Sequence, residues 1–204
     1  MAFPLAAERI AKILDCPASA VAANWPLIEQ CLLPFPGYSN RVAIAALATV
    51  AVETCYKFQP IHEIGSRDYF IKHYWENQHV RAMLGNRSPE DAWKYAGRGF
   101  IQTTGLTNYI NEGRAIGVDL IDEPNDPTDD NDPDKACQPT VAACLLADFF
   151  VKHKVYEAAN AGDYTRVRKI VNGGTNSLQA FLAICAKLEG AIHAKATAGA
   201  VAGS

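Results

Sequence analysis

The sequence lacks the features of a nucleic-acid-binding protein or of a membrane-spanning protein. Its 19 Lys and Arg residues are outnumbered by 22 Asp and Glu residues, which gives a formal net charge of −3. The basic residues are scattered and form no cluster. The longest apolar run, from Val42 to Val52 and interrupted only by Thr49, is too short to cross a bilayer and suits a buried helix. We therefore expect no nucleic-acid partner and no stable membrane insertion.

A secretory signal peptide and a metal-binding cysteine motif are also missing. Between Met1 and Asp15 the apolar positions are interrupted by Glu8, Arg9 and Lys12, so no continuous apolar segment forms. The six cysteines lie far apart and include no Cys-x-x-Cys pair, the spacing typical of zinc and redox sites. We expect free thiols and assign no metal and no cofactor.

Helical periodicity dominates the sequence that remains, and 204 residues suit a single domain, 1–204. An N-terminal helical cap is predicted over about 1–37, with its second helix interrupted at Pro26. A core of about 38–193 follows, and the last helix is expected to end near its boundary, before a flexible tail at 194–204. Other helices of the core are predicted over 106–116, 139–152 and 163–171.

The stretch from Tyr95 to Gly105 predicts a short strand between glycine breaks. Because side chains alternate along a strand, Phe100, Gln102 and Thr104 are predicted to share one face, with Thr103 on the other. One face would then carry an amide beside a hydroxyl, and both groups need hydrogen-bond partners once they leave water. A sugar, which is rich in hydroxyl groups, is such a partner.

Four short motifs occur in order within about Val42 to Asn172. They are Gly97-Arg98-Gly99-x-Ile101-Gln102-x-Thr104, Asn108-Tyr109, Ile116-Gly117-x-Asp119-Leu120 and Ile170-Val171-Asn172-Gly173-Gly174. As an ordered set they resemble the family 19 glycoside hydrolases, which are inverting chitinases and their peptidoglycan-cutting relatives among phage endolysins. The resemblance implies a mainly α fold (α+β, lysozyme-like), with two helical lobes around a cleft and one small β-sheet.

Two glutamates match the chemistry of glycoside hydrolysis, in which one carboxylic acid protonates the leaving oxygen and one carboxylate activates water. Glu53 fits the acid, because desolvation and the helix dipole at the end of an apolar helix both disfavour its charged form. Glu63 fits the base, because it lies in a polar loop. Alternatives stay open: Glu53 as a helix-terminal acid paired with a basic residue, and Asp68 or Glu76 as the base.

The resemblance assigns further roles. Val52-Glu53-Thr54-Cys55 matches a His-Glu-Thr-Gly-like motif of the family, with Val52 in place of His. The short spacing from Glu53 to Glu63 is that of bacterial and phage relatives. Thr104 would help to hold the attacking water, whereas sugar contacts are implied for Gln102, Asn108 and Asn172. Asn172 can equally be read as a turn residue, since Asn-Gly-Gly favours turns.

These observations together predict a monomeric, inverting glycosidase of the endolysin or lysozyme type that cleaves bacterial peptidoglycan. As a bacteriophage protein without an export signal, it would be made in the host cytoplasm and reach the cell wall through a separate pore during cytolysis. The alternatives are a chitinase acting on chitin oligomers, a catalytically inactive sugar-binding homologue, for which Val52 in place of His is the argument, and a lytic transglycosylase.

Overall fold

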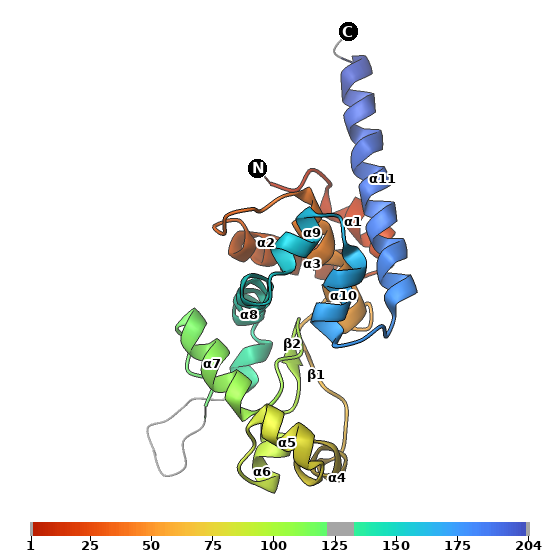
Figure 1. The fold of residues 1–204 in the computed structure, drawn as a ribbon. Coiled ribbons are helices and arrows are strands. Elements are labelled where there is room, and N and C mark those ends of the chain that lie inside the picture. The colour runs from red at the N-terminus through yellow and green to blue at the C-terminus, as the bar shows by residue number, and fades with distance from the viewer. Residues whose placement is uncertain (1, 122–132, 203–204) are drawn as a thin grey trace. The chain divides into compact units, whose positions relative to one another are not determined.

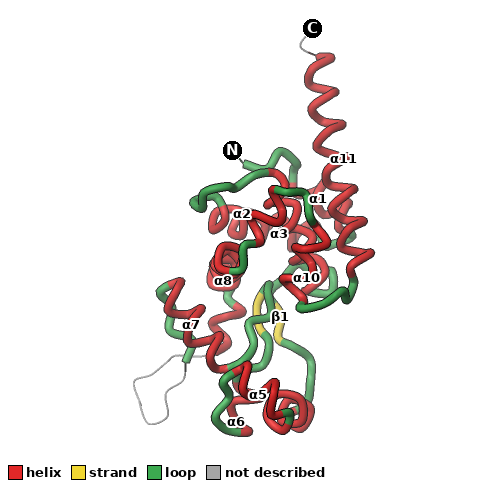
Figure 2. The backbone as a smooth tube through the Cα atoms, in the orientation of Figure 1, coloured by secondary structure: helices red, strands yellow, loops and turns green. Residues whose placement is uncertain are grey.

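The structure, a computed structural model, describes residues 2–121 and 133–202. Helices predominate and one two-stranded sheet is present (Figures 1 and 2), so the predicted mainly α fold with one small sheet is confirmed. The chain divides into two compact units, one formed by Met1–Gln59 with Phe150–Ser204 and the other by Pro60–Phe149. The single domain with a helical cap and a core stays a prediction.

The first unit is built around a buried helix. Its helices are α1 (Ala7–Leu14), α2 (Ala18–Leu32), α3 (Asn40–Glu53), α9 (Val155–Asn160), α10 (Tyr164–Asn172) and α11 (Leu178–Ala202), while α8 (Pro139–Lys152) runs across the boundary between the units. Every residue of α3 from Val42 to Ala51 is buried, as the apolar run predicts. The Ser39 hydroxyl accepts a hydrogen bond from the Val42 backbone N–H and caps the helix. Glu53 therefore stands at the end of a rigid, buried element.

Two predictions for the first unit are wrong. Helix α2 continues through Pro26, because it buries Trp25 and Ile28 on either side of the proline and so offsets the hydrogen bond that proline cannot make. The last helix is also longer than predicted, since α11 continues through Ala202 (Figure 1). Every second residue from Ala194 to Ala202 is alanine, the residue with the highest helix propensity, which favours continuation of the helix.

The second unit contains the sheet and several short helices. They are β1 (Ile61–His62), α4 (Arg67–Ile71), the π-helix η1 (Lys72–Glu76), α5 (Gln78–Leu84), α6 (Pro89–Lys94), β2 (Arg98–Gly99), α7 (Leu106–Ile116) and the 3₁₀-helix η2 (Pro133–Cys137). The strands pair antiparallel, with Ile61 opposite Gly99 and His62 opposite Arg98. Helix α7 stops before Gly117, whose φ of 71° is left-handed, as predicted. One cluster of its buried residues consists of Tyr95, Leu106, Tyr109, Leu120, Ala136 and Leu145.

The strand predicted from Tyr95 to Gly105 is present only at Arg98–Gly99, which form β2, and is wrong for the rest of the stretch. After Gly99 the chain turns back, and the backbones of Arg98 and Thr103 exchange two hydrogen bonds, of 3.1 and 3.0 Å. Gln102 has a φ of 56°, which belongs to a turn and not to a strand. A Cβ on Gly99 would lie 2.9 Å from the Ala136 carbonyl oxygen, so η2 packs where only glycine fits. The strand expected to place Gln102 and Thr104 on one face and Thr103 on the other is therefore absent, and a turn places these side chains instead.

Most of the acidic, proline-rich stretch after Ile121 lies outside the described residues. None of the six cysteines, all of which lie in the described residues, forms a disulfide bond. Within residues 2–121 and 133–202, no helix combines the length and the apolar character that a bilayer span requires.

Candidate active site

Glu53 is held by an arginine of the same unit. Its carboxylate forms an ion pair with Arg168 of α10, and the two side chains are 16% and 2% exposed. The Arg168 Nε also donates a 2.8 Å hydrogen bond to the Asn176 carbonyl oxygen. The alternative left open from the sequence, a helix-terminal acid paired with a basic residue, therefore describes the contact that Glu53 makes. An ion pair does not exclude a catalytic role, because charged partners are common at functional sites.

Thr54 fixes the chain just after Glu53. Its hydroxyl donates to the Val50 carbonyl oxygen at 2.7 Å and accepts from the Phe58 backbone N–H at 2.9 Å. Between these contacts Cys55 and Tyr56 have φ values of 50° and 63°, an uncommon conformation for residues other than glycine. The threonine that follows the glutamate thus serves to close the end of α3.

Asn172 lies in the same unit, at the end of α10. It follows Arg168 by four positions, so the two side chains share a helix face. The Asn172 Oδ1 is shielded from solvent and accepts no hydrogen bond from any residue that the structure describes. A shielded acceptor of this kind is costly unless a ligand or water supplies a donor. The predicted contact of Asn172 with a sugar is compatible with this geometry and stays a prediction.

Glu63 lies in the second unit, directly after β1, and its carboxylate is oriented by two donors. The Tyr74 hydroxyl donates to Oε1 at 2.7 Å, and the Gly97 backbone N–H donates to Oε2 at 3.0 Å. Burial and the contact with Glu63 raise the pKa of Tyr74, which keeps the phenol protonated and able to donate. Tyr74 belongs to the π-helix η1, a rare element that is frequent at functional sites.

Gly97 is the point at which the predicted groups of this unit meet. A Cβ added there would lie 3.0 Å from Glu63 Oε2, 3.0 Å from Gln102 Oε1 and 3.2 Å from the Thr104 hydroxyl. The structure therefore brings together the predicted base, the predicted water-holding hydroxyl and one predicted sugar contact. Only a residue without a side chain leaves room for all three.

Gln102 and Asn108 each hold the local backbone as well. The Gln102 amide nitrogen donates to the carbonyl oxygens of Ile61 and Gly99, at 3.1 and 3.0 Å, and so ties the turn to β1. The Asn108 amide nitrogen donates to the Thr104 carbonyl oxygen at 2.7 Å. Their amide oxygens would be the atoms left to accept from sugar hydroxyls.

Thr103 and Thr104 have different surroundings. The Thr103 hydroxyl is buried and donates to the Glu112 carboxylate at 2.6 Å. Thr104 is half-buried, and its hydroxyl donates to the Gln102 carbonyl oxygen at 2.7 Å while it faces Gly97. Thr103 thus has a structural partner, Glu112. The predicted strand gave no information on this partner.

The alternative bases are less well placed than Glu63. Asp68 and Glu76 are both exposed, whereas Glu63 is half-buried and accepts two hydrogen bonds. Among the described residues no group of three or more His, Cys, Asp or Glu side chains could hold a metal ion. No role beside the two glutamates was predicted for Arg168, Tyr74 or Gly97, although Gly97 belongs to the first motif. Arg168 also carried a signal, its helical spacing from Asn172.

The chain is similar to known proteins in sequence and in fold. No family model matches the chain. A stretch of 99 residues, 46% of this chain, is 34% identical to a glycosyl hydrolase family 19 domain-containing protein of Haemophilus influenzae. The stretch covers 40% of that protein, so the chain matches less than half of its relative's length. The resemblance to the family 19 glycoside hydrolases is confirmed.

A solved structure has a similar fold. Chitinase C from Streptomyces griseus superposes with a TM-score of 0.62 and 18% sequence identity, over 92% of this chain and 75% of the chitinase. At this level of identity the agreement concerns the fold alone. The similarity in fold extends over both compact units of this chain.

Proposed function

We propose that this family 19-like chain is an inverting glycosidase that hydrolyses the glycan strands of bacterial peptidoglycan. The observation that carries the proposal is the group around Gly97, in which the Glu63 carboxylate is held by Tyr74 and faces Thr104 and Gln102. A water molecule activated by a carboxylate needs an oriented base and a second polar group to hold it. Glu63 and Thr104 supply these two groups.

Glu53 is the proposed acid, which protonates the leaving oxygen. In the structure Glu53 is the anion of an ion pair with Arg168, so it has to take up a proton before it can donate one, and the guanidinium stabilises the anion that proton donation restores. Arg168 is therefore a positioning residue, because it acts on the substrate only through Glu53. Water activated at Glu63 would attack the anomeric carbon and invert its configuration.

Peptidoglycan is the proposed substrate because the short spacing between Glu53 and Glu63 resembles that of bacterial and phage relatives. We further propose that the protein acts as a monomeric endolysin, made in the host cytoplasm and released to the wall through a separate pore. Chitin is the second candidate, since the solved structure with the same fold is a chitinase.

The test is the release of new reducing ends from two substrates under the same conditions, purified peptidoglycan and chitin oligomers. Faster release from peptidoglycan supports the proposal, and faster release from chitin transfers the assignment to a chitinase. No release from either substrate would identify an inactive sugar-binding homologue.

A further inference from the structure

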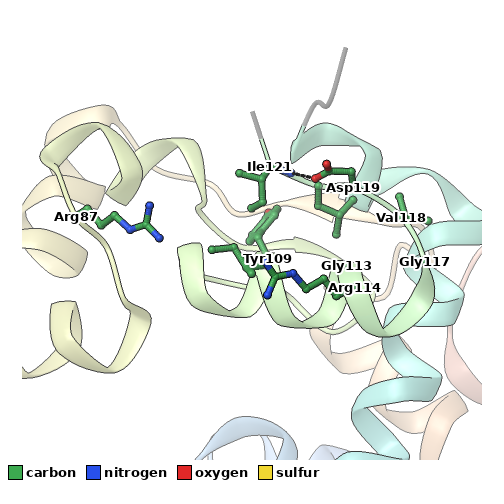
Figure 3. Close-up of a pocket in the computed structure, with 10 residues that line it drawn as sticks. Arg87, Tyr109, Gly113, Arg114, Gly117, Val118, Asp119 and Ile121 are labelled. Carbon is green, nitrogen blue, oxygen red and sulfur yellow. Dashed lines mark hydrogen bonds between the residues drawn. The ribbon is translucent and has the colours of Figure 1, made fainter. Parts of the chain in front are cut away.

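A pocket in the second unit lies apart from the candidate catalytic residues. It has a volume of about 370 Å³ and is formed by α7, the segment that follows it and the loop before α6 (Figure 3). Its floor contains the buried residues Tyr109, Gly113 and Leu120. Neither Glu63 nor the other residues around Gly97 line it. The pocket therefore lies outside the group of residues that is proposed to activate water.

Two arginines supply the positive charges that line this pocket. Arg87 and Arg114 both line it, and in Figure 3 their guanidinium groups point into the same gap from opposite sides. Both side chains are exposed, and neither forms an ion pair or a side-chain hydrogen bond with a residue in the described part of the chain. A guanidinium presents several N–H donors in a planar fork that matches a carboxylate.

The net charge of the residues that line the pocket favours one class of anion over another. Asp119 also lines it, and its Oδ1 accepts a 3.0 Å hydrogen bond from the Ile121 backbone N–H. Among the described residues that line the pocket, two guanidinium groups and one carboxylate leave a single net positive charge, which suits a monoanion better than a phosphate dianion. The apolar floor suits a small aliphatic group next to that anion. A free carboxylate on a short peptide has both properties.

Tyr109 connects the pocket to the group around Gly97. Its ring lies in the pocket floor, and its hydroxyl donates to the Ala96 carbonyl oxygen at 2.9 Å and accepts from Arg98 Nη1 at 3.0 Å. Ala96 directly precedes Gly97, which donates to Glu63. A ligand that fills the pocket thus contacts a side chain that is bonded to the segment beside the proposed base.

We propose that the pocket binds a free carboxylate of the peptide stems that peptidoglycan carries and chitin lacks. The inference rests on the proposed function and deepens it, because it gives the chain a means to prefer peptide-bearing glycan. Arg87 and Arg114 hold the carboxylate, and the floor around Tyr109 accepts the adjoining aliphatic group.

The experiment compares the double variant Arg87→Gln/Arg114→Gln with a control of equal charge, Arg9→Gln/Arg166→Gln, which removes two exposed arginines of the first unit. Each protein is assayed on intact peptidoglycan and on the same peptidoglycan after its free carboxylates have been converted to amides by carbodiimide coupling with an amine. The expected result is a KM raised about tenfold, equivalent to about 1.4 kcal/mol, for the double variant on intact peptidoglycan alone. Equal KM values for the two double variants, or an equal loss on both substrates, would overturn the proposal.

A binding measurement separates this inference from the proposed function. A synthetic stem tripeptide with free carboxylates is titrated into the protein, and the backbone amide signals of Gly113 and Gly117 are followed by NMR. Both signals are expected to shift with the wild-type protein, but not with the Arg87→Gln/Arg114→Gln variant or with a tripeptide whose carboxylates are amidated. If wild-type protein cuts neither glycan yet binds the tripeptide, the proposed function fails and the pocket assignment stands. If inorganic phosphate shifts the same signals as strongly as the tripeptide, the carboxylate assignment is wrong.

Discussion

Glu53, the last residue of α3, forms an ion pair with Arg168 of α10, whose side chain is only 2% exposed. A buried guanidinium that loses its anionic partner keeps the cost of its desolvation without the compensating attraction. Substitutions at Glu53 are therefore expected to change the stability of the first unit as well as the chemistry.

The first prediction concerns Glu53→Gln. Loss of the acid should lower turnover by about 10² to 10⁴-fold. The free energy of unfolding should fall by about 1.5–3 kcal/mol, the usual worth of a hydrogen bond to a charged group. Turnover and chemical denaturation are measured on the same preparation, with the exposed Glu8→Gln as the control that should change neither. A Glu53→Gln variant with more than half of wild-type turnover would remove Glu53 from the role of acid.

The second prediction concerns Gly97→Ala. The added methyl group would need space that Glu63, Gln102 and Thr104 occupy at 3.0 to 3.2 Å, so it should displace the proposed base and its neighbours. Turnover is expected to fall at least tenfold, whereas helical content by circular dichroism should stay the same. The matched control is Gly190→Ala in α11, where the methyl group meets open space and should stabilise the helix by about 1 kcal/mol. Full activity in Gly97→Ala would show that the arrangement around Gly97 is not needed for catalysis.

The third prediction separates Thr103 from Thr104. Thr103→Val leaves the buried Glu112 without its hydroxyl partner and should lower the free energy of unfolding by about 1–3 kcal/mol. Thr104→Val should reduce turnover by up to about tenfold, in keeping with one hydrogen bond of ~0.5–1.5 kcal/mol, with little change in stability. Thermal unfolding and turnover are compared for both variants. The reverse pattern, an unstable Thr104→Val and an inactive but stable Thr103→Val, contradicts the arrangement described.

The fourth prediction concerns stereochemistry. With Glu63 activating water and not attacking the sugar, the first product should carry the inverted anomeric configuration. Proton NMR of a defined glycan oligomer, recorded within the first turnovers before the anomers equilibrate, reports this directly. A retained configuration in the first product is incompatible with Glu63 as the base of an inverting enzyme.

Parts of the fold could be predicted because they depend on local sequence. The apolar run of α3 and its Ser39 cap specify a buried helix, and Gly117 ends α7 in a left-handed conformation that other residues adopt rarely. The turn after β2 depends instead on the fit of Gly99 against Ala136, which is distant in the sequence. A run of β-branched and aromatic residues indicated a strand because propensity does not include such contacts.

The candidate site shows the same division. Glu53 and Glu63 could be singled out from their local surroundings and from the motifs of family 19. Their partners could not, since Arg168 is 115 residues from Glu53 in the chain and Tyr74 reaches Glu63 from a π-helix. The periodicity of an ordinary α-helix gives no information on where a π-helix directs its side chains.

Hydrolysis of peptidoglycan glycan by water activated at Glu63 can be followed in the products. Purified peptidoglycan is digested in water enriched in the heavy oxygen isotope, and the products are weighed by mass spectrometry. Each new reducing end is expected to carry one labelled oxygen, and Glu63→Gln is expected to release about 10² to 10⁴-fold less product. Products that end in anhydro-sugars without label, or undiminished release by Glu63→Gln, would contradict hydrolysis by water activated at Glu63.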